Sequence, residues 1–362
     1  NTTASYNTAF GRSALQSNTT GPINTAIGHA AMYSNTIGCR NTAVGNAALY
    51  DNTTGSFNIA MGDCALQNNT TGVHNTAVGN HSLDTNTTGC DNIAIGFCAL
   101  FANTTGIYNT AIGSKALHIN TTGQHNTASG YMASRANTTG VGNAAYGQQT
   151  LYGNTTGSCN TAIGNAAMLC NTTGNYNTAV GPRALFCNTT ASYNTAVGIG
   201  SGCLNTTGNQ IVAVGSYALG ANTTGASNTA SGYNTLRLNT TGANNTASGA
   251  YALYANTTAS NNTAVGHRAL RYNTTGSSNS AIGNSSQRGT TTGYGNASVG
   301  TMSLYANTTG HSNIAVGMRS LYTNTTGTKN VALGDCALKL NTTGSRNTAS
   351  GAYALAKNTT AQ

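Results

Sequence analysis

The chain has 362 residues, of which 5% are charged, and 14 Lys and Arg against 5 acidic residues give a formal net charge of +9 at pH 7. The basic residues are scattered along the chain without a dense patch, which argues against nucleic acid as a partner. No apolar run reaches the length of about 18 residues that is typical of a transmembrane helix, so no membrane span is predicted.

A 17-residue repeat starts at Asn1 and continues through the chain without insertion or deletion, giving 21 complete repeats and a five-residue remainder. Its consensus is N-T-T-G-x-x-N-T-A-V/I-G-x-x-A-L-x-x, and its positions are numbered here from one to seventeen. A unit this short cannot bury its own apolar face and must stack on its neighbours. The repeat therefore predicts one continuous stacked array.

The first element of each repeat is N-T-T-G, at positions one to four. Position one is Asn except at Thr290, position two is always Thr, and position seven is Asn except at Ile211. Identical amides stacked at strand spacing can hydrogen-bond along the stacking axis, as in cross-β ladders. We therefore expect rows of hydrogen-bonded Asn side chains, with a corner of the coil at the Gly of position four.

The second element is a short strand, predicted at positions seven to ten because Thr, Val and Ile favour strands. Position eleven is Gly in every complete repeat, which indicates a positive φ or a close backbone approach. Positions eight to ten never carry a charge. Since successive strand residues face opposite sides, one face is expected to pack inside the coil. The other is expected to be covered by a second chain or by glycan.

The third element is a further strand, predicted from position fourteen to position three of the next repeat. Position fifteen is Leu or Met in 18 of 21 repeats and predicts a thin apolar core. Every Lys, Arg and Asp lies at position six, twelve, thirteen, sixteen or seventeen. Because unpaired charges are costly to bury, these positions are predicted to face water.

These elements together predict an all-β fold, a parallel β-solenoid (β-roll) with one 17-residue coil per repeat and 21 coils. At about 4.8 Å per coil the array would be roughly 100 Å long. Residues 1–362 are interpreted as a single array with no internal boundary. Since solenoids normally end in distinct caps, the chain is expected to be a segment of a longer fibre.

The N-T-T triplet is also an acceptor pattern for N-glycosylation. Structural stacking is the favoured interpretation, because one glycan on every coil of a row would crowd severely. The candidate acceptors are Asn1, Asn18, Asn52, Asn69, Asn86, Asn103, Asn120, Asn137, Asn154, Asn171, Asn188, Asn205, Asn222, Asn239, Asn256, Asn273, Asn307, Asn324, Asn341 and Asn358.

Two of the nine cysteines, Cys170 and Cys187, both occupy position seventeen in adjacent repeats. Strands stacked about 4.8 Å apart bring such a pair within the Cα range of a disulfide. The pair is therefore a candidate disulfide. The alternative is two small residues in an outward row.

No catalytic, metal-binding or cofactor-binding residues are predicted, and no cofactor is expected. The chain has no Glu, its Asp residues lie on scattered repeats, and no His and Cys residues show metal-ligand spacing. His74 and His81 share a turn of the array without an obvious third ligand. The sequence thus favours a protein that is not an enzyme.

The N-T-A-V-G unit, at 41–45 and 177–181, resembles the S-x-A-x-G repeats of trimeric autotransporter adhesin heads. The longer string N-T-A-V-G-x-x-A-L-x-x-N-T-T-G is similar to repeat arrays in phage tail-fibre-like and bacterial surface proteins. The resemblance covers the whole chain and implies a left-handed parallel β-roll packed as a trimer. The adhesin repeats are somewhat shorter than 17 residues.

The predicted function is a non-enzymatic extracellular structural fibre, such as a surface filament, an adhesin shaft or a tail-fibre stem, with a glycan coat as an additional feature. Its predicted partners are copies of itself, in a lateral trimer or bundle and an end-to-end filament, together with glycans or a cell surface. The alternative is an ice- or carbohydrate-binding solenoid that uses its stacked Thr rows.

Overall fold

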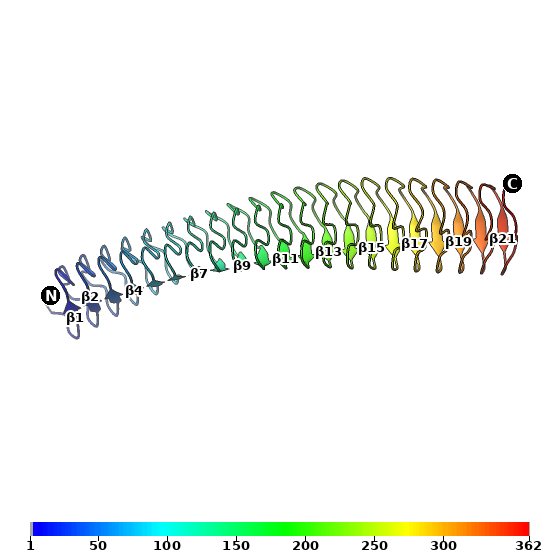
Figure 1. The fold of residues 1–362 in the computed structure, drawn as a ribbon. Helices are drawn as coiled ribbons and strands as arrows, with labels where there is room; N and C mark the ends of the chain where they lie inside the picture. The colour runs from blue at the N-terminus through cyan, green and yellow to red at the C-terminus, as the bar shows by residue number, and fades with distance from the viewer. Residues whose placement is uncertain (1–2, 362) are drawn as a thin grey trace. The chain divides into compact units, whose positions relative to one another are not determined.

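The structure is a computed structural model that describes residues 3–361, and these residues contain 21 strands and no helix. They form two compact units, Asn1–Asn177 and Thr178–Gln362, each described here by itself. Each unit is a parallel β-solenoid with one 17-residue coil per repeat, as Figure 1 shows. The predicted all-β solenoid fold is therefore confirmed. That the two units belong to one array stays a prediction.

The strands are three residues long and occupy positions eight to ten of every repeat. In the first unit they are β1 (Thr8–Phe10), β2 (Thr25–Ile27), β3 (Thr42–Val44), β4 (Ile59–Met61), β5 (Thr76–Val78), β6 (Ile93–Ile95), β7 (Thr110–Ile112), β8 (Thr127–Ser129), β9 (Ala144–Tyr146) and β10 (Thr161–Ile163). In the second unit they are β11 (Thr178–Val180), β12 (Thr195–Val197), β13 (Val212–Val214), β14 (Thr229–Ser231), β15 (Thr246–Ser248), β16 (Thr263–Val265), β17 (Ser280–Ile282), β18 (Ala297–Val299), β19 (Ile314–Val316), β20 (Val331–Leu333) and β21 (Thr348–Ser350).

Within each unit, consecutive strands pair in parallel with an offset of one repeat. Thr25 lies opposite Thr42 in the first unit, and Thr229 lies opposite Thr246 in the second. Each position of the repeat therefore forms a row along its unit. A residue's neighbours across coils are found 17 residues before and after it in the sequence.

The core of each unit is thin and consists mainly of small side chains. The Ala at position nine points inward and the Leu at position fifteen packs in the same interior, as in Ala94 and Leu100, both fully buried. Positions eight and ten face outward, as Ile93 and Ile95 do. The strand thus has one inward and one outward face, as its alternation predicts.

Two rows of buried Asn side chains hold the coils together. At position one, Asn52 donates from Nδ2 to Asn35 Oδ1 at 2.7 Å and to the Gly55 carbonyl at 3.0 Å. At position seven, Asn41 donates from Nδ2 to the Gly55 carbonyl at 2.8 Å, and its Oδ1 accepts the backbone N–H of Asn58 at 2.9 Å. The predicted hydrogen bonding of stacked amides along each unit is confirmed.

The predicted second strand, from position fourteen to position three, is wrong for the described residues. Positions twelve to seventeen form turns instead. Non-glycine residues at positions thirteen and fifteen have left-handed backbone, as in Cys98 and Leu100, both with φ 51°. This conformation is incompatible with an extended strand. Backbone hydrogen bonds between coils hold it, such as Cys98 N–H to the Asn80 carbonyl at 3.0 Å.

Gly is favoured at positions eleven and four for different structural reasons. At position eleven the predicted positive φ is confirmed, for example 124° at Gly113. At position four the backbone is outside the left-handed region, but a Cβ on Gly55 would lie 2.4 Å from the Gly72 carbonyl oxygen. Gly is thus favoured at position four by the close approach of the next coil rather than by its own φ.

One stretch of the second unit's core is polar. Gln287 replaces the usual Leu at position fifteen, and Ser298 replaces the usual Ala at position nine. The Gln287 Nε2 donates to Ser298 Oγ at 2.9 Å and to the Ser280 carbonyl at 2.8 Å. Ser286 hydrogen-bonds to Ser298 and to Ser303. We call Ser286, Gln287, Ser298 and Ser303 the polar core cluster.

Candidate functional site

The outward strand face of each unit consists of positions eight and ten of the strands. In the first unit Met61 is 44% exposed and Ile95 is 39% exposed. In the second unit Val214 is 39% exposed and Val316 is 40% exposed. No Lys, Arg, Asp or Glu occurs at these positions in any repeat.

Such a surface is unusual for a protein in water. Parallel sheets are normally covered on both faces, and contiguous exposed apolar patches mark interaction sites. Apolar residues at position ten follow one another on paired strands from β2 to β7 in the first unit and from β16 to β20 in the second, while Ser occupies this position in β8, β14, β15 and β21. The geometry makes this face the first candidate for binding another surface.

The Thr residues at positions two and three form two rows with different roles. At position two the hydroxyl forms a hydrogen bond between coils. Thr53 Oγ1 donates to the Thr70 carbonyl at 3.0 Å, and Thr206 Oγ1 donates to the Thr223 carbonyl at 3.0 Å in the equivalent way. At position three the side chain is exposed, as in Thr88 and Thr122. Only the row at position three therefore presents its side chains freely to solvent.

The candidate glycosylation sites lie in the position-one Asn row. Asn1 lies outside the described residues. Asn358 is half-buried, and the other candidates are buried with at most 2% exposure. A glycan would attach at Nδ2, which in Asn86 donates to Asn69 Oδ1 at 2.8 Å and to the Gly89 carbonyl at 2.9 Å. The folded coil thus uses the hydrogens that a glycan would replace. Glycosylation stays a prediction.

The candidate disulfide partners fall in different units, because Cys170 belongs to the first and Cys187 to the second. Their pairing therefore stays a prediction.

At position sixteen, outward aromatic residues of adjacent coils stack on one another in short rows. The rings of Tyr33 and Tyr50 are 5.0 Å apart and nearly parallel. The same geometry recurs for Tyr305 and Tyr322 in the second unit, at 5.1 Å. These stacks support neighbouring coils without creating a cleft.

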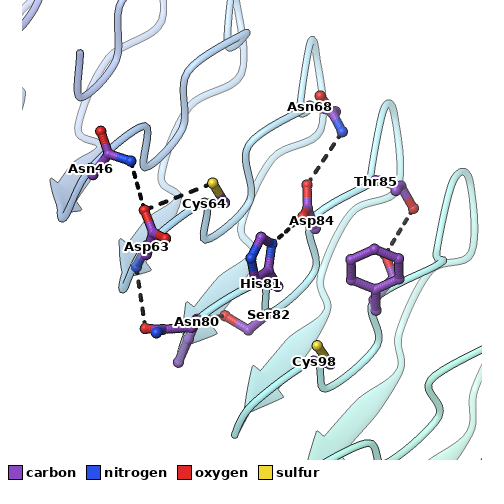
Figure 2. Close-up of polar contacts among 12 residues, drawn as sticks. Asn46, Asp63, Cys64, Asn68, Asn80, His81, Ser82, Asp84, Thr85 and Cys98 are labelled. Carbon is purple, nitrogen blue, oxygen red and sulfur yellow. Dashed lines mark hydrogen bonds and ion pairs between the residues drawn. The ribbon is translucent and has the colours of Figure 1, made fainter. Parts of the chain in front are cut away.

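A group of potential metal ligands lies on the turns after β4 and β5, as Figure 2 shows. One ligand atom each from Asp63, Cys64 and His81 lies within 4.8 Å of the others. The His81 Nδ1 is 2.7 Å from Asp84 Oδ2. The prediction that charged positions face water is wrong for Asp84, which is buried with 7% exposure because His81 and Asn68 hydrogen-bond to its carboxylate.

Sequence reasoning missed this group because it searched for ligand spacings along the chain. Cys64 and His81 are 17 residues apart, so the coil offset brings them side by side. Both occupy position thirteen, where the left-handed backbone has φ 51° at Cys64 and 54° at His81. The signal in the sequence is that Cys64 and His81 occupy equal positions of adjacent repeats and that Asp63 directly precedes Cys64.

Burial raises the pKa of the Cys64 thiol, and the nearby carboxylates of Asp63 and Asp84 raise this pKa further. The thiol thus stays protonated unless a cation compensates the negative charge around it.

No family model matches the chain, and no curated protein sequence matches it. Residues 3–361 contain no helix that is long and apolar enough to cross a membrane.

Proposed function

We propose that this protein is a non-enzymatic structural fibre that works outside the cell and associates laterally with copies of itself. The observation that carries the proposal is the uncharged outward strand face, which is apolar at position ten over several consecutive coils in each unit. Covering it with the same face of another copy would remove apolar surface from water, at about 25 cal/mol per Å². The resemblance to adhesin heads and tail-fibre-like arrays supports a trimer or bundle outside the cell.

The Asn rows support a mechanical role. Each coil is joined to the next by backbone and side-chain hydrogen bonds that repeat along each unit. A coil added at either end of such an array would form the same bonds. This repetition suits an end-to-end filament in which length and surface, rather than a cleft, are the useful properties.

Charges placed on the outward strand face should dissociate the assembly without unfolding the chain. We expect the double variant Val214→Lys/Val316→Lys to shift the protein to fewer chains per particle, because burying two unpaired ammonium groups is costly. Native mass spectrometry, with and without deglycosylation, counts the chains and measures any glycan mass.

The matched control is Ser216→Lys/Met318→Lys, which places the same charges two residues further along the same coils. Position twelve already carries Arg12 and Asp63, so it accepts charge. The control should keep the wild-type chain count. A wild-type protein that is monomeric and free of glycan would refute lateral association through this face.

The second candidate function is binding of an ordered lattice, such as ice or a crystalline carbohydrate, by the exposed Thr row at position three. The observation that favours it is the regular exposure of these side chains, as in Thr88, Thr105 and Thr122. The structural-fibre proposal predicts no thermal hysteresis at high protein concentration. A hysteresis gap that disappears in Thr88→Lys/Thr122→Lys would instead favour the lattice binder.

A further inference from the structure

Position thirteen of three successive coils carries a row of metal-ligating residue types, Cys64, His81 and Cys98. Because β4, β5 and β6 pair in register, these residues follow one another along the first unit. Asp63 directly precedes Cys64 and adds a carboxylate on the same side as His81, as Figure 2 shows. Three different donor types thus meet across two neighbouring coils.

The imidazole of His81 is held in an orientation that suits metal binding. Its Nδ1 is 2.7 Å from Asp84 Oδ2, and Asp84 is itself buried and accepts a hydrogen bond from Asn68 Nδ2 at 3.3 Å. A neutral imidazole that donates from Nδ1 has its lone pair on Nε2, where a metal can bind. This carboxylate–histidine pair is the usual support of a metal-ligating His.

Acidic side chains are also concentrated around the group. Residues 41–114 contain no Lys or Arg but hold four of the five Asp residues, in a chain whose net charge is +9. Asp63 accepts a hydrogen bond from the neutral Asn46 Nδ2 at 2.7 Å and has no cationic side chain on its own segment. The segment therefore carries an excess of negative charge at the place where the ligands meet.

We propose that Asp63, Cys64 and His81 bind one divalent metal ion of the zinc class, with Asp84 as a positioning residue. Thiolate, imidazole and carboxylate are the ligand types of Zn²⁺, whereas Ca²⁺ and Mg²⁺ prefer oxygen ligands alone. The fourth tetrahedral position is open to water. Since Cys64 and His81 belong to different coils, the ion cross-links β4 and β5 through their turns.

The chain contains an internal comparison for this proposal. The sequence G-D-C-A-L occurs at 62–66 and again at 334–338. At the second occurrence Asp335 and Cys336 repeat the first two ligands, but Tyr353 stands at the position of His81 one coil later. This second site lacks the imidazole and is expected not to bind the ion.

The test is a titration of the reduced full-length protein with Co²⁺ under anaerobic conditions, followed by displacement with Zn²⁺. We expect one equivalent of Co²⁺ to produce sulfur-to-cobalt charge-transfer absorption and the visible bands of a tetrahedral site. Cys64→Ser should abolish the charge-transfer absorption, while Asp63→Asn and His81→Asn should strongly weaken binding. Asp84→Asn should retain the charge-transfer band with an affinity lowered about 10- to 100-fold.

These variants are expected to fold, because the chain already has Asn80 at position twelve and Ser285 and Asn234 at position thirteen. Circular dichroism of each variant checks that the coil is intact. The matched control is Cys336→Ser, which should leave the absorption and the affinity unchanged. The proposal is overturned if wild-type protein shows no stoichiometric cobalt–thiolate absorption, if Cys64→Ser and His81→Asn bind as wild type does, or if Cys336→Ser loses the signal.

Discussion

Replacing Asn120 by Ala should lower the local free energy of unfolding by about 3 kcal/mol, because buried polar groups left without partners cost about 1–3 kcal/mol each. Its Nδ2 donates to Asn103 Oδ1 and to the Gly123 carbonyl, both at 3.0 Å, and its Oδ1 accepts from Asn137 Nδ2 at 2.8 Å. Amide hydrogen exchange of the flanking coils measures the loss, since opening in a repeat protein can be local.

The control for this prediction is Asn165→Ala, an exposed Asn at position twelve that hydrogen-bonds to Gln148. Its exchange protection should stay within about 0.5 kcal/mol of wild type, as is usual for surface substitutions. Equal effects at Asn120 and Asn165 would show that the position-one row does not stabilise the coil.

A third variant separates the structural role of Asn120 from a role as a glycan acceptor. Thr122 completes the acceptor triplet but is exposed at position three, where Ile37 shows that Thr is not required. Thr122→Ala therefore removes the triplet and keeps the Asn row intact. Exchange protection should be unchanged, and a lower mass on expression in a glycosylating host would show that Asn120 carries a glycan.

The second large effect is expected at the Gly row of position eleven. Gly113 has φ 124°, and a Cβ there would lie 2.7 Å from the Gly130 carbonyl oxygen of the next coil. Backbone strain of about 1–3 kcal/mol and overpacking of about 1–3 kcal/mol should add. We therefore expect Gly113→Ala to destabilise the flanking coils by about 2–5 kcal/mol, measured by urea unfolding and hydrogen exchange.

Gly142→Ala is the matched control, because Gly142 also has positive φ, at 68°, but has only Cys159 Sγ at 3.7 Å from an added Cβ. Other repeats place non-glycine residues there, such as Tyr108 and His125 with φ 56° and 57°. The cost should be about 1 kcal/mol, from the left-handed backbone alone. If Gly113→Ala destabilises the coils by no more than Gly142→Ala does, the next coil must move aside to accommodate the added Cβ.

Much of the fold could be predicted because the repeat samples each structural position many times. The invariant Gly of position eleven predicts a positive φ, and the Asn rows predict hydrogen bonds between coils. The structure contains both. The turns at positions twelve to seventeen could not be predicted, because Leu at position fifteen is equally consistent with an extended and a left-handed backbone. Leu100 takes the left-handed one, at φ 51°, and still buries its side chain.

The candidate surfaces were predictable to different degrees. The uncharged outward strand face follows directly from strand alternation and charge placement, as Ile95 and Val316 illustrate. The ligand group at Asp63, Cys64 and His81 depends on which side chains turn toward one another, which the repeat register allows but does not determine.

The polar core cluster has a consequence for folding. Most coils offer their neighbours the same Ala, Leu and Asn rows, so a chain that skipped one coil would recover nearly the same contacts. Skipping the coil after Gln287 would place Ala315 where Ser298 stands, which removes the hydrogen bonds of Ser298 to Gln287 and to Ser286. At about 0.5–1.5 kcal/mol for each hydrogen bond lost, the cluster penalises that alignment error. The cluster therefore favours one alignment among coils that are otherwise nearly interchangeable.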